Sequence, residues 1–365
     1  MVYRVIGIMS GSSLDGLDIV FAELQEAAAK WSYSIVRADC YPYSSEWADR
    51  LKTATALNAQ EYQLLHVQYG HYIGEAVNRF IAENGLEYQV ALIASHGHTT
   101  FHLPAERMTA QLGDGAAIAA ETGLPVVTDL RALDVALGGE GAPIVPIGEK
   151  LLLGDYDYFL NIGGIANISA AKTSSRIAFD ICAANRVLNM LANKLGKEYD
   201  EGGRLAASGK VNEALLNQLN TLPYYGKAWP KSLANDFGTN TVYPIIGKAG
   251  LSAQDSLRTY VEHIALQVNA AVSAMTVNPP GSDRTLLVTG GGAFNEFLIE
   301  RIEALLIPLR VKVIIPDELL VKYKEALIMA LIGVLRWRQE YNVLSSVTGA
   351  SRDSIGGALW IGQEA

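Results

Sequence analysis

The feature that most constrains the fold is a strand, turn and strand pattern with glycines at its tip, near the start of each half of the chain. Residues 3–9 (YRVIGIM) are typical of a strand, residues 10–16 form a polar glycine-rich turn, and residues 17–22 return as a strand. In the second half, residues 158–162 lead into Gly163-Gly164, and residues 165–169 leave it. Two unrelated hairpins with ordinary turn glycines are the alternative interpretation.

Strand patterns alternate with amphipathic helices along the rest of the chain, which indicates the α/β class. Helices are expected at residues 252–275 and 324–341, where apolar side chains recur on one face. We therefore expect an α/β protein with a duplicated domain, two lobes and a central cleft. The N-terminal lobe would span residues 1–150 and the C-terminal lobe residues 151–365.

The net charge of the chain limits how such glycine turns could bind a ligand. The 365-residue chain has a formal net charge of −9 and no run of Lys or Arg. Nucleic acid and anionic membrane are therefore not expected as partners, because both require clustered cations. Glycine turns allow positive φ angles and expose successive backbone N–H groups, which together form an anion site. Any phosphate bound here would depend on backbone N–H groups, hydroxyl groups or a metal ion.

A third glycine turn joins a predicted buried strand, residues 285–288, to a helix that starts near Asn295. Its sequence is Thr289-Gly290-Gly291-Gly292-Ala293. A strand that enters a helix N-terminus through glycines favours a nucleotide, since the free N–H groups attract anions. A simple tight turn would look the same. Neither of the common nucleotide motifs, GxxxxGK[ST] and GxGxxG, is present.

Carboxylates lie next to these elements. Asp180 follows the predicted strand at residues 177–179, where it could act as a general base. Asp15 lies in the first turn and could bind hydrated Mg²⁺, with Asp18 close by in sequence. Such residues are more often only caps or turn formers.

The segment that follows residues 90–94 offers a competing chemistry. His96 and His98 form an HxH pattern that could bind Zn²⁺, with Asp114 or Asp129 completing a hydrolase site. The same loop also suits substrate binding. Further along, Arg131, Asp134 and Glu140 lie in a glycine-rich segment that could bind a polyhydroxylated or carboxylate ligand, or could be a solvated connection.

The cysteines and the apolar stretches of the sequence indicate the cellular compartment of the protein. The two cysteines, Cys40 and Cys182, form no disulfide framework, which favours a reduced compartment. The longest apolar stretch, residues 326–335, is shorter than the ~20 residues that span a bilayer. We expect a cytoplasmic protein.

Taken together, these segments resemble the anhydro-N-acetylmuramic acid kinase family over nearly the whole chain. Residues 7–18 (GIMSGSSLDGLD) resemble its opening phosphate motif, with Ser12 where Thr is usual. The sugar-side segments are SHGHT at 95–99 and GGEGAP at 138–143, with His98 and Glu140 where Gln is usual. The second phosphate motif, the adenosine motif and the late helix start are similar to residues 161–167, 290–295 and 324–326.

The resemblance implies a two-lobed fold of the sugar kinase, actin and Hsp70 type. It also implies that ATP and water convert 1,6-anhydro-N-acetylmuramic acid to N-acetylmuramic acid 6-phosphate and ADP, in the recycling of peptidoglycan sugars. ATP and Mg²⁺ would be the cofactors, and the same resemblance implies a homodimer. The other candidate functions are a metal-dependent hydrolase using His96 and His98, and a nucleotide-binding protein without kinase activity.

By the same resemblance, Asp180 would be the catalytic base and Asp15 would lie near Mg²⁺. The residues expected at ATP and its phosphates are Gly11, Ser12, Ser13, Leu14, Asp15, Gly16, Asp18, Gly163, Gly164, Gly290, Gly291, Gly292 and Asn295. The residues expected at the sugar are His96, His98, Arg131, Asp134, Asn161, Asn185 and Glu325. The chain departs from the family pattern beside the base, where it reads DICAAN at 180–185, and after Ser232.

Overall fold

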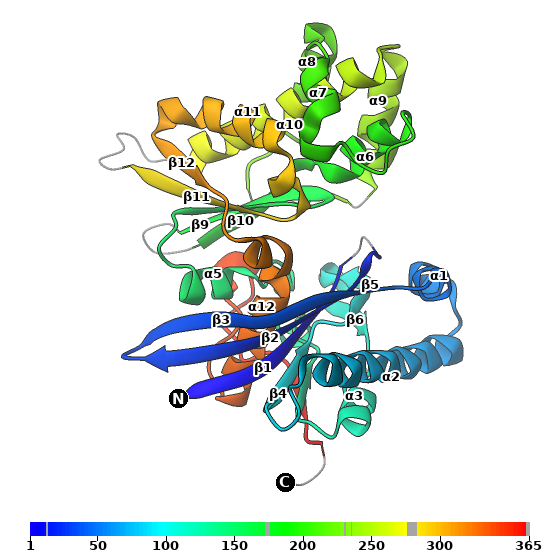
Figure 1. Ribbon diagram of the computed structural model, residues 1–365, viewed down its shortest axis with the longest axis vertical. Coiled ribbons are helices and arrows are strands. Elements are labelled where there is room, and N and C mark those ends of the chain that lie inside the picture. Colours follow the sequence, from blue (N-terminus) through cyan, green and yellow to red (C-terminus); the bar gives the residue numbers. More distant parts are fainter. Residues whose placement is uncertain (12–13, 172–175, 230, 235, 276–282, 363–365) are drawn as a thin grey trace. The chain divides into compact units, whose positions relative to one another are not determined.

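The computed structural model describes residues 1–11, 14–171, 176–229, 231–234, 236–275 and 283–362. These residues form two compact units (Figure 1). Unit 1 contains Met1–Gly154 and Tyr323–Ala365, and unit 2 contains Asp155–Lys322. Each unit is built on a sheet of its own, so the two are described separately.

The sheet of unit 1 has the strand order β13-β7-β4-β1-β2-β3. The first three strands of the chain form an antiparallel meander, while β4 and β7 continue the sheet in parallel with β1. The strands are β1 (Val2–Ser10), β2 (Gly16–Ala27), β3 (Lys30–Pro42), β4 (Leu92–Ser95), β7 (Val126–Thr128) and β13 (Ala358–Trp360). A separate hairpin pairs β5 (His98–Leu103) with β6 (Met108–Leu112).

Alternation of side chains along β1 explains how both faces of this sheet are covered. Ile6 and Ile8 belong to a core cluster that they share with the buried face of α2 (Ala59–Asn84). Gly7 points to the other face, where a Cβ atom would overlap the Ala326 carbonyl of α12 (Glu318–Trp337). Glycine at position 7 therefore lets a helix pack directly on the strand backbone.

The other helices of unit 1 are short, and they flank the sheet or join its strands. They are α1 (Ser45–Thr53), α3 (Gly115–Thr122), α4 (Ala132–Ala136), α5 (Pro146–Leu152) and α13 (Ser345–Thr348). Helix α3 packs beside α2 (Figure 1).

Unit 2 repeats the topology of unit 1. Its sheet has the order β10-β9-β8-β11-β12, again an antiparallel meander followed by two parallel strands. The strands are β8 (Tyr158–Ile162), β9 (Ile165–Ala171), β10 (Arg176–Ala183), β11 (Arg284–Thr289) and β12 (Val311–Ile314). In each unit the glycine-tipped hairpin of the sequence forms the first two strands, so the predicted α/β class and duplicated domain are confirmed.

Helices of unit 2 cover one face of this sheet. The long helix α10 (Ala253–Met275) buries Tyr260, Ile264 and Val268 against Leu160 and Ile168 of the sheet. The other helices are α6 (Asn185–Asn193), α7 (Arg204–Ser208), α8 (Glu213–Asn220), α9 (Tyr243–Lys248) and α11 (Glu296–Leu306). Among the described residues, none of the helices combines the length and apolarity that crossing a bilayer requires.

The division of the chain differs from the predicted one at the C-terminus. The second lobe was expected to run from residue 151 to the end, whereas residues 323–365 belong to unit 1. The physical reason is packing: α12 approaches β1 at Gly7 and β4 at Gly333, and β13 pairs with the edge strand β7. A strand that joins an edge from the far end of the chain leaves no periodic signal of its partner.

Candidate functional site

The first predicted phosphate turn connects β1 and β2 in unit 1. Leu14 has a φ angle of 60°, and its N–H group lies 3.4 Å from the carbonyl oxygen of Gly11. A Cβ atom on Gly16 would lie 2.7 Å from both Cys40 Sγ and the Tyr41 carbonyl oxygen. The turn is therefore tight and has no room for a side chain at position 16. Ser12 and Ser13, two residues of the predicted motif, lie outside the described residues.

Three carboxylates gather beside this turn. Asp18 lies on β2, opposite Met9 and Cys40. Burial raises the pKa of Asp18 to about 6, with smaller contributions from the negative charges of Glu325 and Asp15, while a hydrogen bond with the Cys40 thiol lowers it. Asp15 is exposed and Glu325, on α12, is half-buried. The structure thus brings Asp15, Asp18 and Glu325 near one another in unit 1, although the sequence separates Glu325 by most of the chain.

Histidine and arginine of the predicted sugar side lie next to this group. Arg131 Nε donates a hydrogen bond of 2.7 Å to His96 Nε2, and His96 Nδ1 donates one of 2.8 Å to the Gly97 carbonyl. Burial and the Arg131 charge lower the pKa of His96 to about 3. Burial also lowers the pKa of Arg131 to about 10, partly offset by Glu325 and Asp134. His96 is therefore a neutral ring with both nitrogens occupied.

The position of Asp134 assigns it a different role from the predicted sugar contact. Its side chain is fully buried. One carboxylate oxygen accepts from the Gly141 N–H at 2.8 Å, and the other accepts from the Thr348 hydroxyl at 2.7 Å. Since both oxygens are used inside the protein, Asp134 anchors the glycine-rich loop and leaves ligand contact to its neighbours.

A zinc site at the histidines is not supported by the geometry. Asp114 caps α3 by accepting from the Ala117 N–H, and Asp129 accepts from the Thr128 hydroxyl, so both predicted partners serve local structure. In the part of the chain that the structure describes, no group of three or more His, Cys, Asp or Glu side chains is arranged to hold a metal. Both nitrogens of His96 are also engaged.

In unit 2, three segments that are distant in sequence converge at the tip of the second hairpin. The Asn185 N–H donates to the Gly163 carbonyl at 3.0 Å, and the Asn185 side-chain amide donates to the Ile162 carbonyl at 3.0 Å. A Cβ atom on Gly290 would lie 2.7 Å from Asn161 Oδ1. The second phosphate turn, the start of α6 and the third glycine turn are thus adjacent.

The third glycine turn has the predicted form. Strand β11 ends at Thr289, Gly290 has a φ angle of 81°, and a single 3₁₀ turn, η5 (Gly291–Phe294), leads into α11. A Cβ atom on Gly292 would overlap the Ile162 side chain and lie 3.1 Å from Asn185 Oδ1. Asn295 caps α11, because its side-chain oxygen accepts from the Leu298 N–H at 3.0 Å. The glycines therefore allow β8, α6 and the turn to approach closely.

Four polar side chains form a row across the sheet of unit 2. Thr289 pairs with Asn161, Asn161 with Asn167, and Asn167 with Asp180 in the strand register. Paired residues share a face, and their sequence neighbours Leu160, Ile168 and Phe179 belong to the core on the other face. The row therefore lies opposite the helix-covered face and ends at Asp180. Asn161 and Asp180 are two strand spacings apart, ~10 Å.

The position of Asp180 itself differs from the prediction. The sequence placed it after a strand, but it lies within β10, at an irregularity between Asp180 and Cys182. A β-bulge changes the direction of a side chain and is frequent beside active sites. The alternation of buried and exposed residues in the sequence does not predict this bulge.

The residues around Asp180 come from the segment 223–238, which the sequence predicts to be a long loop and which includes the departure from the family pattern after Ser232. The Leu233 N–H donates to Asp180 Oδ2 at 2.9 Å, and the Tyr224 hydroxyl donates to the Asp180 carbonyl at 2.6 Å. Burial raises the pKa of Asp180, and the Leu233 N–H bond lowers it. Asp180 Oδ1 has no hydrogen-bond partner within the described residues. The carboxylate is thus oriented and half-buried, and one of its oxygens has no partner among the described residues.

The glycine pair 202–203 was also missed. Gly203 has a φ angle of 73°, and a Cβ atom there would overlap the Asn295 side chain. The 3₁₀ turn η3 (Glu201–Gly203) therefore lies against the cap of α11. A Gly-Gly dipeptide after an acidic residue was the available signal, but it resembles an ordinary turn.

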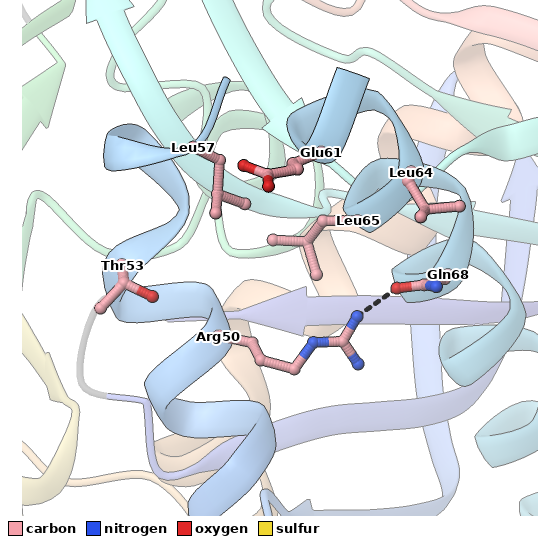
Figure 2. A pocket seen from close by; sticks show the side chains of 7 residues that line it. All are labelled: Arg50, Thr53, Leu57, Glu61, Leu64, Leu65 and Gln68. Carbon is pink, nitrogen blue, oxygen red and sulfur yellow. Dashed lines mark hydrogen bonds between the residues drawn. The ribbon is translucent and has the colours of Figure 1, made fainter. Parts of the chain in front are cut away.

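A separate surface cavity of about 290 Å³ lies between α1 and α2 of unit 1. Arg50 and Gln68 are hydrogen-bonded across it, and Leu57 and Leu65 line its wall (Figure 2). None of the predicted site residues lines this cavity.

Two units with one strand order, each opening on a glycine-tipped hairpin, and a third glycine turn that enters a helix define the class. This is the two-lobed fold of the sugar kinase, actin and Hsp70 type. Within it, residues 3–362 match the family model for anhydro-N-acetylmuramic acid kinase. The chain belongs to the anhydro-N-acetylmuramic acid kinase family, which is a family of enzymes.

Several curated relatives carry the family's name. The anhydro-N-acetylmuramic acid kinase of Francisella tularensis subsp. novicida is 33% identical over 97% of this chain and 97% of its own. That of Vibrio parahaemolyticus is also 33% identical, with 97% of each chain covered. The Aliivibrio fischeri enzyme is 36% identical over 82% of this chain and 83% of its own.

The likeness to solved structures is more distant. A ROK family glucokinase from Streptomyces griseus, in complex with glucose and AMPPNP, aligns with a TM-score of 0.43 at 12% identity. The alignment covers 92% of this chain and 99% of that one. A likeness of this degree says nothing about the reaction.

Proposed function

We propose that this protein uses ATP and water to open 1,6-anhydro-N-acetylmuramic acid and to phosphorylate O6, giving N-acetylmuramic acid 6-phosphate and ADP. The relatives that bear the name of this kinase match the chain at 31–36% identity. The product would enter the recycling of peptidoglycan sugars, in the cytoplasm, where ATP is available.

The observation that carries this proposal is the environment of Asp180. One carboxylate oxygen is held by the Leu233 N–H group and the other is free within the described residues. Burial raises the pKa of the carboxyl group, which makes the carboxylate a stronger base. Asp180 would take one proton from the water molecule whose oxygen attacks the anomeric carbon.

The remaining bond changes follow from that step. The new bond from the water oxygen to the anomeric carbon displaces the bridging oxygen, and the electron pair of the broken C–O bond stays on O6. O6 then attacks the γ-phosphorus of ATP, and the bond to the β-phosphate oxygen breaks to release ADP. The proton on Asp180 returns to solvent, so atoms and charge balance.

Backbone N–H groups would hold the phosphates, because the chain has no lysine cluster for the purpose. Gly11, Gly163 and Gly164 are candidates in the two hairpin turns, and Gly290–Gly292 would lie at the nucleoside. The close approach between Gly290, Gly292 and the second hairpin supports this assignment.

In unit 1, Asp15 would offer one carboxylate to a hydrated Mg²⁺ ion, which does not require a cluster of three protein ligands. Mg²⁺ is usually held by one or two carboxylates together with phosphate oxygens and water. Asp15 is exposed at the first turn. Besides burial, its negative charge and that of Glu325 raise the pKa of Asp18, because the three carboxyl groups lie near one another. Asp15 would hold the ion with Asp18 nearby, and the ion would neutralise phosphate charge as it does in other phosphoryl transfers.

The sugar would be recognised by Arg131, His98 and Glu325 of unit 1 and by Asn161 and Asn185 of unit 2. Arg131 keeps its positive charge at neutral pH despite burial, and its Nε is aimed at His96. A guanidinium group fits the lactyl carboxylate of a muramic acid derivative.

A coupled assay for ADP release in the presence of ATP, Mg²⁺ and the anhydro sugar tests the proposal. We expect ADP release that depends on the sugar and yields one phosphorylated sugar per ADP. N-acetylglucosamine, which has no anhydro bridge, is the control substrate and should give background release. ADP binding without turnover that depends on the anhydro sugar would contradict the proposal and indicate a nucleotide-binding protein without this kinase activity.

A further inference from the structure

Unit 1 contains a continuous line of hydrogen-bonded side chains that ends at His98. The hydroxyl oxygens of Tyr69 and Tyr43 are 2.6 Å apart, and the Tyr43 hydroxyl donates to Ser10 Oγ at 2.8 Å. Ser10 Oγ lies 3.1 Å from His98 Nδ1. Tyr69 is fully buried on α2, and Ser10 is the last residue of β1, directly before the first phosphate turn. The line therefore connects the interior of unit 1 to two predicted site segments.

Counting hydrogens indicates the direction of these hydrogen bonds. A tyrosine hydroxyl has one hydrogen, and Tyr43 gives its hydrogen to Ser10. The bond between the two tyrosines must then use the hydrogen of Tyr69. Ser10 is 3% exposed, so its own hydroxyl hydrogen needs an acceptor inside the protein. Among the described residues, Ser10 contacts His98 Nδ1 at 3.1 Å and also interacts with the hydroxyl of Tyr69. Because Tyr69 already gives its hydrogen to Tyr43, the arrangement in which each hydroxyl donates along the line assigns the Ser10 hydrogen to His98 Nδ1.

The direction determines where the hydrogen of the imidazole lies. A neutral imidazole carries one N–H, and if Nδ1 accepts, the hydrogen is on Nε2. Burial lowers the pKa of His98 to about 4, so the ring is neutral near pH 7. Nε2 has no hydrogen-bond partner within the described part of the chain, although the residue is only 6% exposed. His98 therefore presents one N–H donor that none of the described residues uses.

His96 provides a contrast two residues away. Its Nδ1 must donate to the Gly97 carbonyl, and its Nε2 accepts from Arg131. The two rings thus hold opposite tautomers, and each tautomer is set by its neighbours. Both ring nitrogens of His96 therefore bind other groups of the protein, whereas the Nε2–H of His98 has no partner among the described residues.

We propose that Tyr43 and Ser10 are positioning residues that hold His98 as the Nε2–H tautomer, so that it donates a hydrogen bond to an acceptor oxygen of the sugar. This inference rests on the proposed function for the identity of the ligand. The tautomer itself does not depend on that function, and the two can be tested separately.

The first test is nitrogen NMR of protein labelled with ¹⁵N-histidine, in which the His98 signals are assigned by their loss in His98→Gln. We expect a protonated Nε2 and an unprotonated Nδ1 in the unmodified protein. In Tyr43→Phe, Ser10 loses its donor and becomes free to accept from Nδ1–H, so the two tautomers should mix. Tyr72→Phe is the matched control, because Tyr72 packs in the same aromatic cluster with no part in the line. A protonated Nδ1 in the unmodified protein, or an unchanged tautomer in Tyr43→Phe, would overturn the proposal.

The second test is a double-mutant cycle on sugar binding. Tyr43→Phe should raise the KM for the anhydro sugar about tenfold with kcat changed less than about threefold, since one neutral hydrogen bond is weakened. In the His98→Gln background the same change should raise KM less than about twofold, because a side-chain amide does not tautomerise and always offers its NH₂ donor. An equal rise in both backgrounds would mean that Tyr43 has a merely structural role. Absence of turnover in the unmodified protein would instead overturn the proposed function and leave the NMR test to decide the tautomer.

Discussion

The backbone N–H group of Leu233 donates to Asp180 Oδ2 at 2.9 Å across 53 residues of sequence. This bond fixes the carboxylate and favours its charged form, whereas burial opposes that form more strongly, so the net effect on the pKa of Asp180 is upward. The loop that contains Leu233 lies where the sequence departs from the family pattern, after Ser232. It still supplies the contact through its backbone, which is independent of side-chain identity.

Replacing the carboxylate tests whether Asp180 is the base. Asp180→Asn keeps the size of the side chain and removes the proton acceptor, so kcat should fall by on the order of 10²–10⁴. Nucleotide binding, measured by calorimetry with ADP, should stay within about twofold. Asp155→Asn, at an exposed position of the same unit, is the control and should have ordinary turnover. Near-normal kcat in Asp180→Asn would remove Asp180 from the mechanism.

The pH dependence of kcat/KM should report the pKa of Asp180. A base must be deprotonated to act, so activity rises with pH through that pKa, which lies above the ordinary value of 3.8. Leu233→Pro removes the N–H that stabilises the carboxylate, so the pKa rises further and the acid limb should move to higher pH by about one unit.

Leu233→Ala keeps the backbone N–H and serves as the matched control, whose acid limb should coincide with that of the unmodified protein. A limb that shifts equally in both variants would point to the leucine side chain and away from the hydrogen bond.

A substitution of Asp134 distinguishes a role in stability from a role in substrate binding. Asp134→Asn replaces one of the two accepting oxygens with an NH₂ donor that faces either the Gly141 N–H or the Thr348 hydroxyl. Leaving a buried donor unpaired costs about 1–3 kcal/mol, which urea unfolding would measure as a lower free energy of unfolding. Glu140→Gln, exposed in the same loop, should change it little. Unchanged stability with a raised KM for the sugar would show instead that Asp134 touches the substrate.

The sequence predicted the parts of the fold that leave a local pattern. The two hairpins, the strand and turn at residues 285–293 and the helix at residues 252–275 follow from alternation, glycine placement and helical periodicity. The helix expected at residue 324 begins earlier, at Glu318, because Asp317 accepts from the Leu320 N–H as a cap. The return of residues 323–365 to unit 1 depends on long-range packing and could not be read from any window of sequence.

For the candidate site, residue types were easier to predict than their roles. Asp180, Asn161 and Gly290 were singled out, but the polar row that joins Asn161 to Asp180 through Asn167 exists only in the strand register. Asp134 looked like a ligand contact because a charged side chain in a glycine-rich loop is usually exposed. Its partner Thr348 lies 214 residues away, which no local pattern reveals.

The buried carboxyl group of Asp18 should make stability depend on pH. Its pKa is about 6 in the folded protein against an ordinary value of 3.8, so the folded state binds more protons across that interval and stability falls as pH rises through it. Asp18→Asn removes this cost, on the order of 1–3 kcal/mol at pH 8, and the gain should shrink as pH falls toward 4. Urea unfolding at several pH values measures it. A gain that is constant with pH would assign the effect to packing against Cys40.

The third glycine turn should be sensitive to a single methyl group. In Gly292→Ala the new Cβ atom would overlap Ile162 and crowd Asn185, so the turn must move away from the second hairpin. If these glycines lie at the nucleoside of ATP, the KM for ATP should rise at least about tenfold. Gly247→Ala is the control, because that glycine lies on α9 with no atom within 4 Å of the added carbon. It should keep the KM for ATP and leave the melting temperature equal or slightly higher, since Ala is the better helix former. A Gly292→Ala protein that remains folded by circular dichroism and binds ATP as the unmodified chain does would show that ATP binds elsewhere.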